Sequence, residues 1–134
     1  MVKLISGKFG SGKTKRIIEL ANDTMANSSG HVVYIDDDKR HMYDLKHDLR
    51  FISMNEFPIN TAEEFIGFIC GIISNDYDIE HIFIDGLCKV MTCEIEHLPA
   101  FIARLEDIGK RYDISFIASI SCDSLPPELD SYQI

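Results

Sequence analysis

The chain has 134 residues, of which 46% are hydrophobic and 26% charged, so we expect one domain over residues 1–134 with a buried core rather than a disordered or fibrous chain. Its formal net charge is −9, which argues against nucleic acid as a partner because binding to phosphates needs a basic surface. The longest apolar run, Phe65 to Ile73, is too short to span a bilayer, and without a recognisable signal peptide we expect a soluble cytoplasmic protein.

The first half of the chain alternates between predicted strands and helices. An apolar strand at Lys3–Ser6 precedes a glycine-rich turn and a helix from about Gly12 to Ala26, whose apolar residues recur with helical spacing. A second strand is predicted at His31–Ile35. The polar segment Lys39–Asp48 is expected to be a short helix or a loop, and Arg50–Met54 a third strand.

The second half continues the alternation. A Thr-Ala-Glu-Glu capping box predicts a helix over Thr61–Ser74. This helix is apolar nearly all round, so we expect it to be buried, with Cys70 as a small core residue. A fourth strand at His81–Ile84, a helix over Pro99–Tyr112 and a fifth strand at Ile114–Ile120 follow. The pattern predicts a three-layer α/β sandwich with a mostly parallel five-stranded sheet.

The turn after the first strand carries the clearest motif. Residues 7–14, Gly-Lys-Phe-Gly-Ser-Gly-Lys-Thr, match the pattern G-x-x-x-x-G-K-[ST] between a predicted strand and a predicted helix. Glycines let the backbone curl so that its N–H groups point at a phosphate, and the new helix adds its dipole. Lys13 is expected to neutralise the β- and γ-phosphates, and the Thr14 hydroxyl to bind Mg²⁺. The predicted phosphate-binding residues are Gly7, Lys8, Phe9, Gly10, Ser11, Gly12, Lys13, Thr14 and Lys15.

Acidic residues follow three of the predicted strands. An apolar strand ending in Asp85 resembles a Walker B element, whose carboxylate would hold Mg²⁺ together with Thr14. Gly86 stands where many ATPases carry a glutamate. Asp36 and Glu56, after the second and third strands, are candidate water-orienting carboxylates that would act in catalysis with Lys13. Capping of turns is the alternative role for such acids.

Polar residues outside these motifs offer further candidates. Ser119 and Ser121, at the end of the last strand, would suit a γ-phosphate sensor or be ordinary strand-end serines. The four cysteines form no C-x-x-C pair. A metal site at Cys88 and Cys93 would need His97 or another partner.

Residues 7–14 together with Asp85 are similar to the P-loop NTPase superfamily, and this resemblance covers most of the chain. With the segments 35–38 and 84–86, they look like a family of small bacterial ATP-binding proteins of unknown function, some labelled as motility ATPases. The resemblance implies binding of ATP with Mg²⁺ and leaves the biological role open.

Two other groups share fragments with this chain. Lys8 sits where partitioning and septum-site ATPases carry a lysine that reaches the partner's phosphate across a homodimer, although Phe9 replaces the expected glycine. Thymidine kinases are similar in the placement of the loop and in Asp38–Arg40, but their zinc-binding cysteine pairs are missing. We expect one strand between the first strand and the Walker B strand, as in RecA-like ATPases; direct adjacency would instead support the partitioning-ATPase relation.

Three functions are compatible with these residues. The first is an Mg²⁺-dependent ATP-binding protein that acts as a slow ATPase or a nucleotide-controlled switch, as a homodimer or with an unknown protein partner. ATP would then order residues 39–50 or a dimer face. The second is a nucleotide-dependent binding module without hydrolysis. The third is a small-molecule kinase of the nucleoside type, for which the chain offers no obvious lid. No guanine-reading motif occurs, which favours ATP over GTP.

Overall fold

The structure, a computed structural model, describes residues 1–134. It contains five strands, four α-helices and four short 3₁₀ helices. The strands are β1 (Val2–Gly7), β2 (His31–Asp36), β3 (Arg50–Ser53), β4 (Ile79–Ile84) and β5 (Ser115–Ser121). The helices are α1 (Lys13–Asn27), α2 (Ala62–Asn75), α3 (Leu87–Val90) and α4 (Leu98–Tyr112). The 3₁₀ helices are η1 (Met42–Asp44), η2 (Met54–Glu56), η3 (Ile95–His97) and η4 (Pro127–Tyr132).

The five strands form one all-parallel sheet in the order β1-β5-β4-β2-β3. The central strands contain short apolar runs, such as Ile82–Ile84 in β4 and Phe116–Ala118 in β5, as expected of parallel strands covered on both faces. One strand, β5, separates β1 from β4, so the predicted intervening strand is confirmed. The direct adjacency that the partitioning-ATPase relation favours is not observed.

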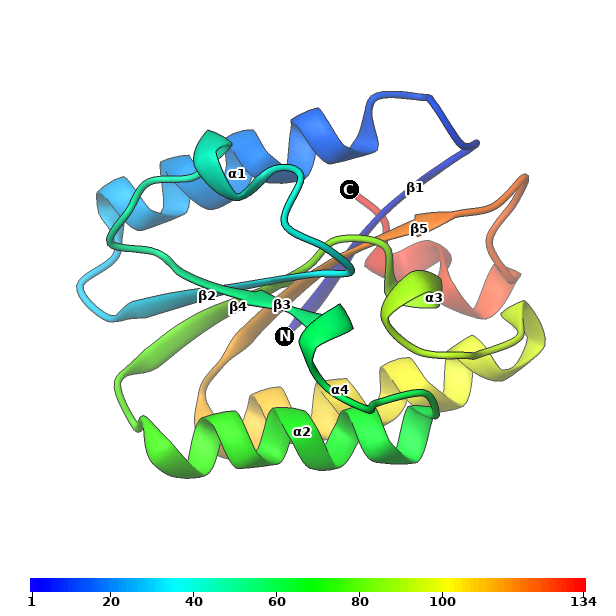
Figure 1. The fold of residues 1–134 in the computed structure, drawn as a ribbon. Coiled ribbons are helices and arrows are strands. Elements are labelled where there is room, and N and C mark those ends of the chain that lie inside the picture. The colour runs from blue at the N-terminus through cyan, green and yellow to red at the C-terminus, as the bar shows by residue number, and fades with distance from the viewer.

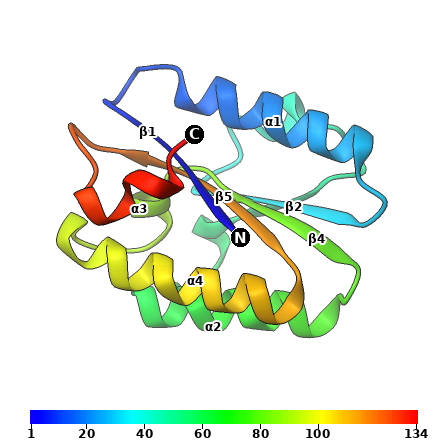
Figure 2. The same ribbon diagram turned by 180° about the vertical axis from the view of Figure 1, so that it is seen from behind.

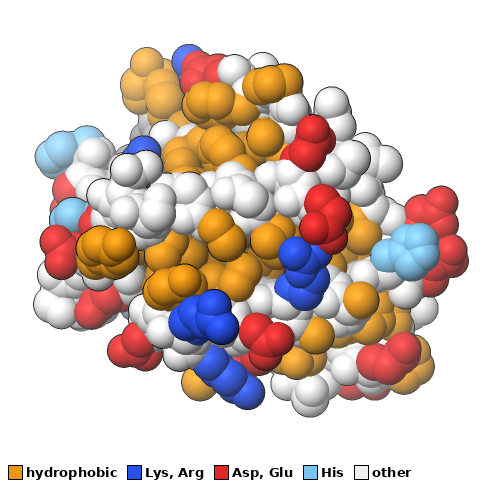
Figure 3. All heavy atoms as spheres, turned by 90° about the horizontal axis from the view of Figure 1, so that it is seen from below, with side chains coloured by type: hydrophobic (Ala, Val, Ile, Leu, Met, Phe, Trp, Pro, Cys, Tyr) orange, Lys and Arg blue, Asp and Glu red, His pale blue; other side chains and the backbone are white.

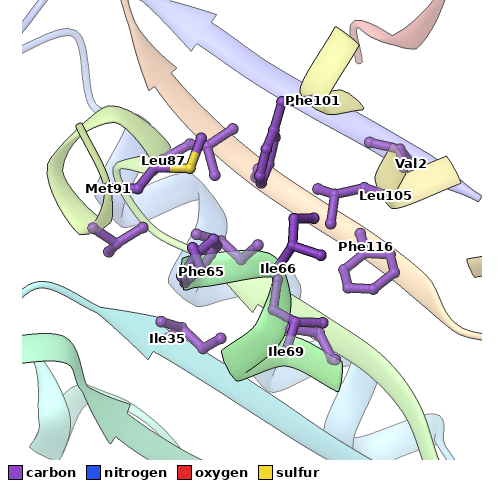
Figure 4. Close-up of a cluster of buried hydrophobic side chains, with 14 of the residues drawn as sticks. Val2, Ile35, Phe65, Ile66, Ile69, Leu87, Met91, Phe101, Leu105 and Phe116 are labelled. Carbon is purple, nitrogen blue, oxygen red and sulfur yellow. The ribbon is translucent and has the colours of Figure 1, made fainter. Parts of the chain in front are cut away.

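Helices cover both faces of the sheet. Figures 1 and 2 show α1 on one face and α2 with α4 on the other. A cluster of 26 buried residues fills the space on the α2 and α4 side, and Figure 4 shows side chains of this cluster, among them Phe65, Phe101 and Phe116. A smaller cluster of 10 buried residues lies on the α1 side. The predicted three-layer α/β arrangement is therefore confirmed.

Helix α2 begins as predicted but is less buried than predicted. The Thr61 hydroxyl accepts a hydrogen bond from the Glu64 N–H, and the Glu64 carboxylate accepts one from the Thr61 N–H, which completes the capping box. Only one face of α2 packs on the sheet, so the predicted core position of Cys70 is wrong: this residue is exposed. Figure 3 looks onto the α2 and α4 layer, where hydrophobic atoms lie between charged side chains.

Four short helices, α3, η2, η3 and η4, lie where the sequence pattern predicted no helix. Helix α3 follows β4 directly and has only four residues, too few to show a helical period. Helix η4 begins at Pro127, where the proline pair ends any longer element but fits a first turn. No helix in the chain combines the length and hydrophobicity that crossing a bilayer requires.

Candidate functional site

The carboxyl ends of the parallel strands lie along one edge of the sheet, at the right in Figure 1. A hollow of about 230 Å³ lies at this edge. Open parallel sheets bind ligands outside the carboxyl ends of their strands, so this hollow is the candidate site. Its lining residues are Phe9, Gly10, Gly12, Lys13, Thr14, Arg40, His41, Asp85, Gly86, Lys89, Ser119 and Ser121.

Three larger hollows lie elsewhere on the molecule. One of about 510 Å³ lies between α2 and α4 and includes Ile66 and Arg111. A second, of about 550 Å³, includes His31 and Asp78 at the opposite edge of the sheet. A third, of about 340 Å³, lies at the end of α1 and includes Asn27. None combines a glycine-rich loop, several cations and a buried carboxylate, so the smaller hollow is the stronger candidate.

The backbone of the loop between β1 and α1 requires glycine at two positions. Gly10 and Gly12 have φ angles of 81° and 88°, which favour glycine over residues with a side chain. At Gly7 a Cβ atom would lie 2.6 Å from the Ser11 Oγ, so a side chain there would make the Ser11 hydroxyl move. Lys13 begins α1 at the end of this loop and its Nζ donates to the Lys8 carbonyl at 2.7 Å. The ammonium group therefore lies against the loop and makes no ion pair with a carboxylate.

Asp85 anchors a hydrogen-bond network below the loop. This residue directly follows β4 and is 6% exposed. Its Oδ1 accepts hydrogen bonds from the Ser119 hydroxyl at 2.8 Å and the Thr14 hydroxyl at 3.5 Å. Its Oδ2 accepts one from the Tyr34 hydroxyl at 3.1 Å. The predicted metal ligands Thr14 and Asp85 are thus brought together, and both offer the hard oxygen atoms that Mg²⁺ prefers.

The sequence analysis left two roles open for one member of this network, Ser119, and did not identify another, Tyr34. Ser119, a candidate γ-phosphate sensor, donates to Asp85 and accepts from the Gly86 N–H at 2.7 Å, so it holds the turn after β4. Ser121 lines the hollow. Tyr34 was not singled out at all, because a tyrosine inside an apolar strand gives no signal that its hydroxyl will meet a carboxylate 51 residues away.

Asp36 lies at the end of β2, beside β4, and is 4% exposed. Its Oδ1 accepts from the Asp37 N–H at 2.7 Å, while its Oδ2 has no hydrogen-bond partner. Burial, followed by the neighbouring Asp37 and Asp85 carboxylates, raises the pKa of Asp36 to about 8. The carboxyl is therefore largely protonated at neutral pH, and it lies near the hollow without lining it.

The structure does not bring every predicted residue to the hollow. Glu56 lies in η2, after the edge strand β3, where its carboxylate pairs with the Lys39 Nζ at 2.5 Å. Lys15 is exposed on α1 outside the lining. Cys88 and Cys93 form no metal cluster with His97; the one group of three ligand-type side chains within 4.8 Å is His31, Asp76 and Asp78.

Two cations of the hollow lie outside the glycine-rich motif. Arg40, in the loop after β2, has its Nε 2.9 Å from an Asp38 carboxylate oxygen. Lys89, in α3, has its Nζ 5.3 Å from the centre of the Phe9 ring. Phe9 itself is 82% exposed. Sequence reasoning did not assign these cations to the site, because only the fold brings the loops after β1, β2 and β4 together.

Comparison of the chain with protein-family models finds no match, and comparison with curated proteins finds none either.

Proposed function

We propose that this protein is a P-loop NTPase that binds ATP with Mg²⁺ in the hollow at the carboxyl edge of the sheet. The observation that carries the proposal is the conformation of residues 7–14 together with the contact of Thr14 with Asp85. The left-handed Gly10 and Gly12 leave open space beside their Cα atoms, where no atom lies within 4 Å of a Cβ position. A backbone loop of this kind suits the close approach of a phosphate chain.

Lys13, Thr14 and Asp85 have distinct roles in this proposal. Lys13 neutralises the β- and γ-phosphates, exchanging its contact with the Lys8 carbonyl for the stronger contact with an anion. The Thr14 hydroxyl would coordinate Mg²⁺, and the Asp85 carboxylate would hold the water molecules bound to the ion. Tyr34 and Ser119 donate to Asp85 and so fix the orientation of its carboxylate.

Hydrolysis is proposed to be slow. Gly86 occupies the position of the glutamate that activates water in many ATPases. Asp36 is largely protonated near neutral pH, and neither Asp36 nor Glu56 lines the hollow, so neither is placed to take a proton from a water molecule there. A bound nucleotide would persist, which suits a switch acting through a homodimer or a protein partner, in a soluble cytoplasmic setting.

The absence from the hollow of either candidate water-orienting carboxylate, Asp36 or Glu56, also favours a second candidate, a binding module that holds ATP without hydrolysing it. Kinase activity has less support, because the 230 Å³ hollow provides no separate acceptor site.

Calorimetric titration of Mg-ATP and Mg-GTP, with a phosphate-release assay on the same sample, tests the proposal. Lys13→Ala should weaken ATP binding at least about tenfold while leaving the fold intact, because it removes a charge-assisted contact with the phosphates. Lys15→Ala is the matched control, since Lys15 is exposed outside the hollow. Wild-type affinity in a folded Lys13→Ala variant would refute the proposal; binding without release would favour the binding module.

A further inference from the structure

The hollow is strongly cationic within an acidic molecule. The chain carries a net charge of −9, yet Lys13, Arg40 and Lys89 all line this one hollow. Asp85 is the only acid that lines it, and both of its oxygens already accept hydrogen bonds. A concave wall with several cations concentrates anions. The loop motif explains Lys13 alone, so Arg40 and Lys89 need an explanation of their own.

Arg40 is held in a position that leaves most of its donors free. Its Nε and its backbone N–H both donate to the Asp38 Oδ1, at 3.1 and 2.9 Å. The Nη2 is 3.9 Å from an Asp37 oxygen, beyond hydrogen-bond distance. A guanidinium group carries five N–H donors in a planar fork, so the Nη groups remain available to a phosphate beside Lys13.

Lys89, in α3 after β4, lines the same hollow. Its Nζ stacks above the ring of Phe9 in the glycine-rich loop, 5.3 Å from the ring centre, and it makes no ion pair with a carboxylate. The contact joins α3 to the loop between β1 and α1 and holds the ammonium group at the hollow.

The size of the hollow indicates which part of a nucleotide it encloses. Sites that enclose a whole drug-sized ligand measure roughly 300–1,000 Å³, whereas this hollow measures about 230 Å³. It therefore suits the phosphate chain and its ion, with the nucleoside outside. The three cations, Asp85 and a bound Mg²⁺ would together carry a charge of about +4, which matches the four negative charges of ATP better than the three of ADP.

We propose that Arg40 and Lys89 bind the terminal phosphate of the nucleotide and so let the site distinguish a triphosphate from a diphosphate. This inference rests on the proposed function. Arg40 reaches the hollow from residues 37–41, which connect β2 to η1, and Lys89 reaches it from α3.

The test compares the affinities of a non-hydrolysable Mg-ATP analogue and of Mg-ADP in four proteins: the wild type, Arg40→Gln, Lys89→Gln and, as a control, Arg111→Gln. Arg111 lines the separate hollow between α2 and α4. The substitution Arg111→Gln therefore removes the same charge from the protein, away from the candidate site. Each of the two site variants should lower the ratio of triphosphate to diphosphate affinity about tenfold, as expected for a hydrogen bond between charged groups. Affinity for Mg-ADP should stay within about twofold of the wild type.

The outcomes separate this inference from the proposed function. Binding of the triphosphate by the wild type, with an unchanged affinity ratio in both Arg40→Gln and Lys89→Gln, would overturn the terminal-phosphate role and leave the proposed function standing. Absence of nucleotide binding by the wild type would overturn both. An equal loss in Arg111→Gln would mean that net charge, and not contact, sets the ratio, which also contradicts the inference.

Discussion

At the scale of single residues, Asp36 is the buried carboxyl with the least support, because its Oδ2 has no hydrogen-bond partner. Burial raises its pKa from 3.8 to about 8. Between these pH values the unfolded chain has released a proton that the folded protein still holds, so the free energy of unfolding falls as pH rises. Above about pH 8 the Asp36 carboxyl ionises in the folded protein too, so its effect on the free energy of unfolding no longer changes with pH.

Asp36→Asn removes that ionisation while keeping the shape of the side chain. The variant should be more stable than the wild type at pH 8.5 by more than about 1 kcal/mol, and the difference should shrink toward pH 5. Urea denaturation at both pH values measures the difference in the free energy of unfolding between the variant and the wild type. Asp48→Asn, at an exposed position without hydrogen bonds to its side chain, is the control. A difference between Asp36→Asn and wild type that does not change with pH would count against the raised pKa.

At the scale of elements, the capping box at the start of α2 is the clearest case in which a local sequence signal became a structure. Thr61→Ala removes the acceptor of the Glu64 N–H and should lower the free energy of unfolding by about 1 kcal/mol. Thr24→Ala, inside α1, should change it by less than about 0.5 kcal/mol, because alanine suits a helix interior. Equal effects of both substitutions in thermal denaturation would show that the cap contributes nothing.

The five strands were predictable to within two residues at each end, because strands buried on both faces are unbroken apolar runs such as Ile82–Ile84. The single turn of α3 was not predictable, because one helical turn shows no periodic pattern in the sequence. In the candidate site, the contact of Thr14 with Asp85 followed from the motif. Two other features could not be predicted: the hydrogen bond from the Tyr34 hydroxyl to Asp85 and the position of Arg40 in the hollow. Both depend on the order of the strands in space and not on spacing along the chain.

At the scale of the whole molecule, the end of the described chain supports the strand that carries the candidate site. Gln133 forms a parallel bridge with Leu4, and the Ile134 N–H donates to the Leu4 carbonyl at 2.9 Å. The Ile134 carbonyl accepts from Arg16 of α1. These contacts cover the edge of β1 that would otherwise present unpaired backbone groups, directly before the glycine-rich loop.

A chain ending at Tyr132 should therefore lose about 1–2 kcal/mol of stability, because backbone hydrogen bonds at the β1 edge are removed. It should also self-associate more readily, since an open edge strand pairs with other chains. Chemical denaturation and light scattering measure the two effects. Gln133→Ala is the matched control: it removes only the bond from its side chain to the Ser6 hydroxyl and keeps the backbone pairing. If the shortened chain and Gln133→Ala behave alike, the backbone pairing of residues 133–134 does not hold the edge, and β1 is supported by β5 and the core alone.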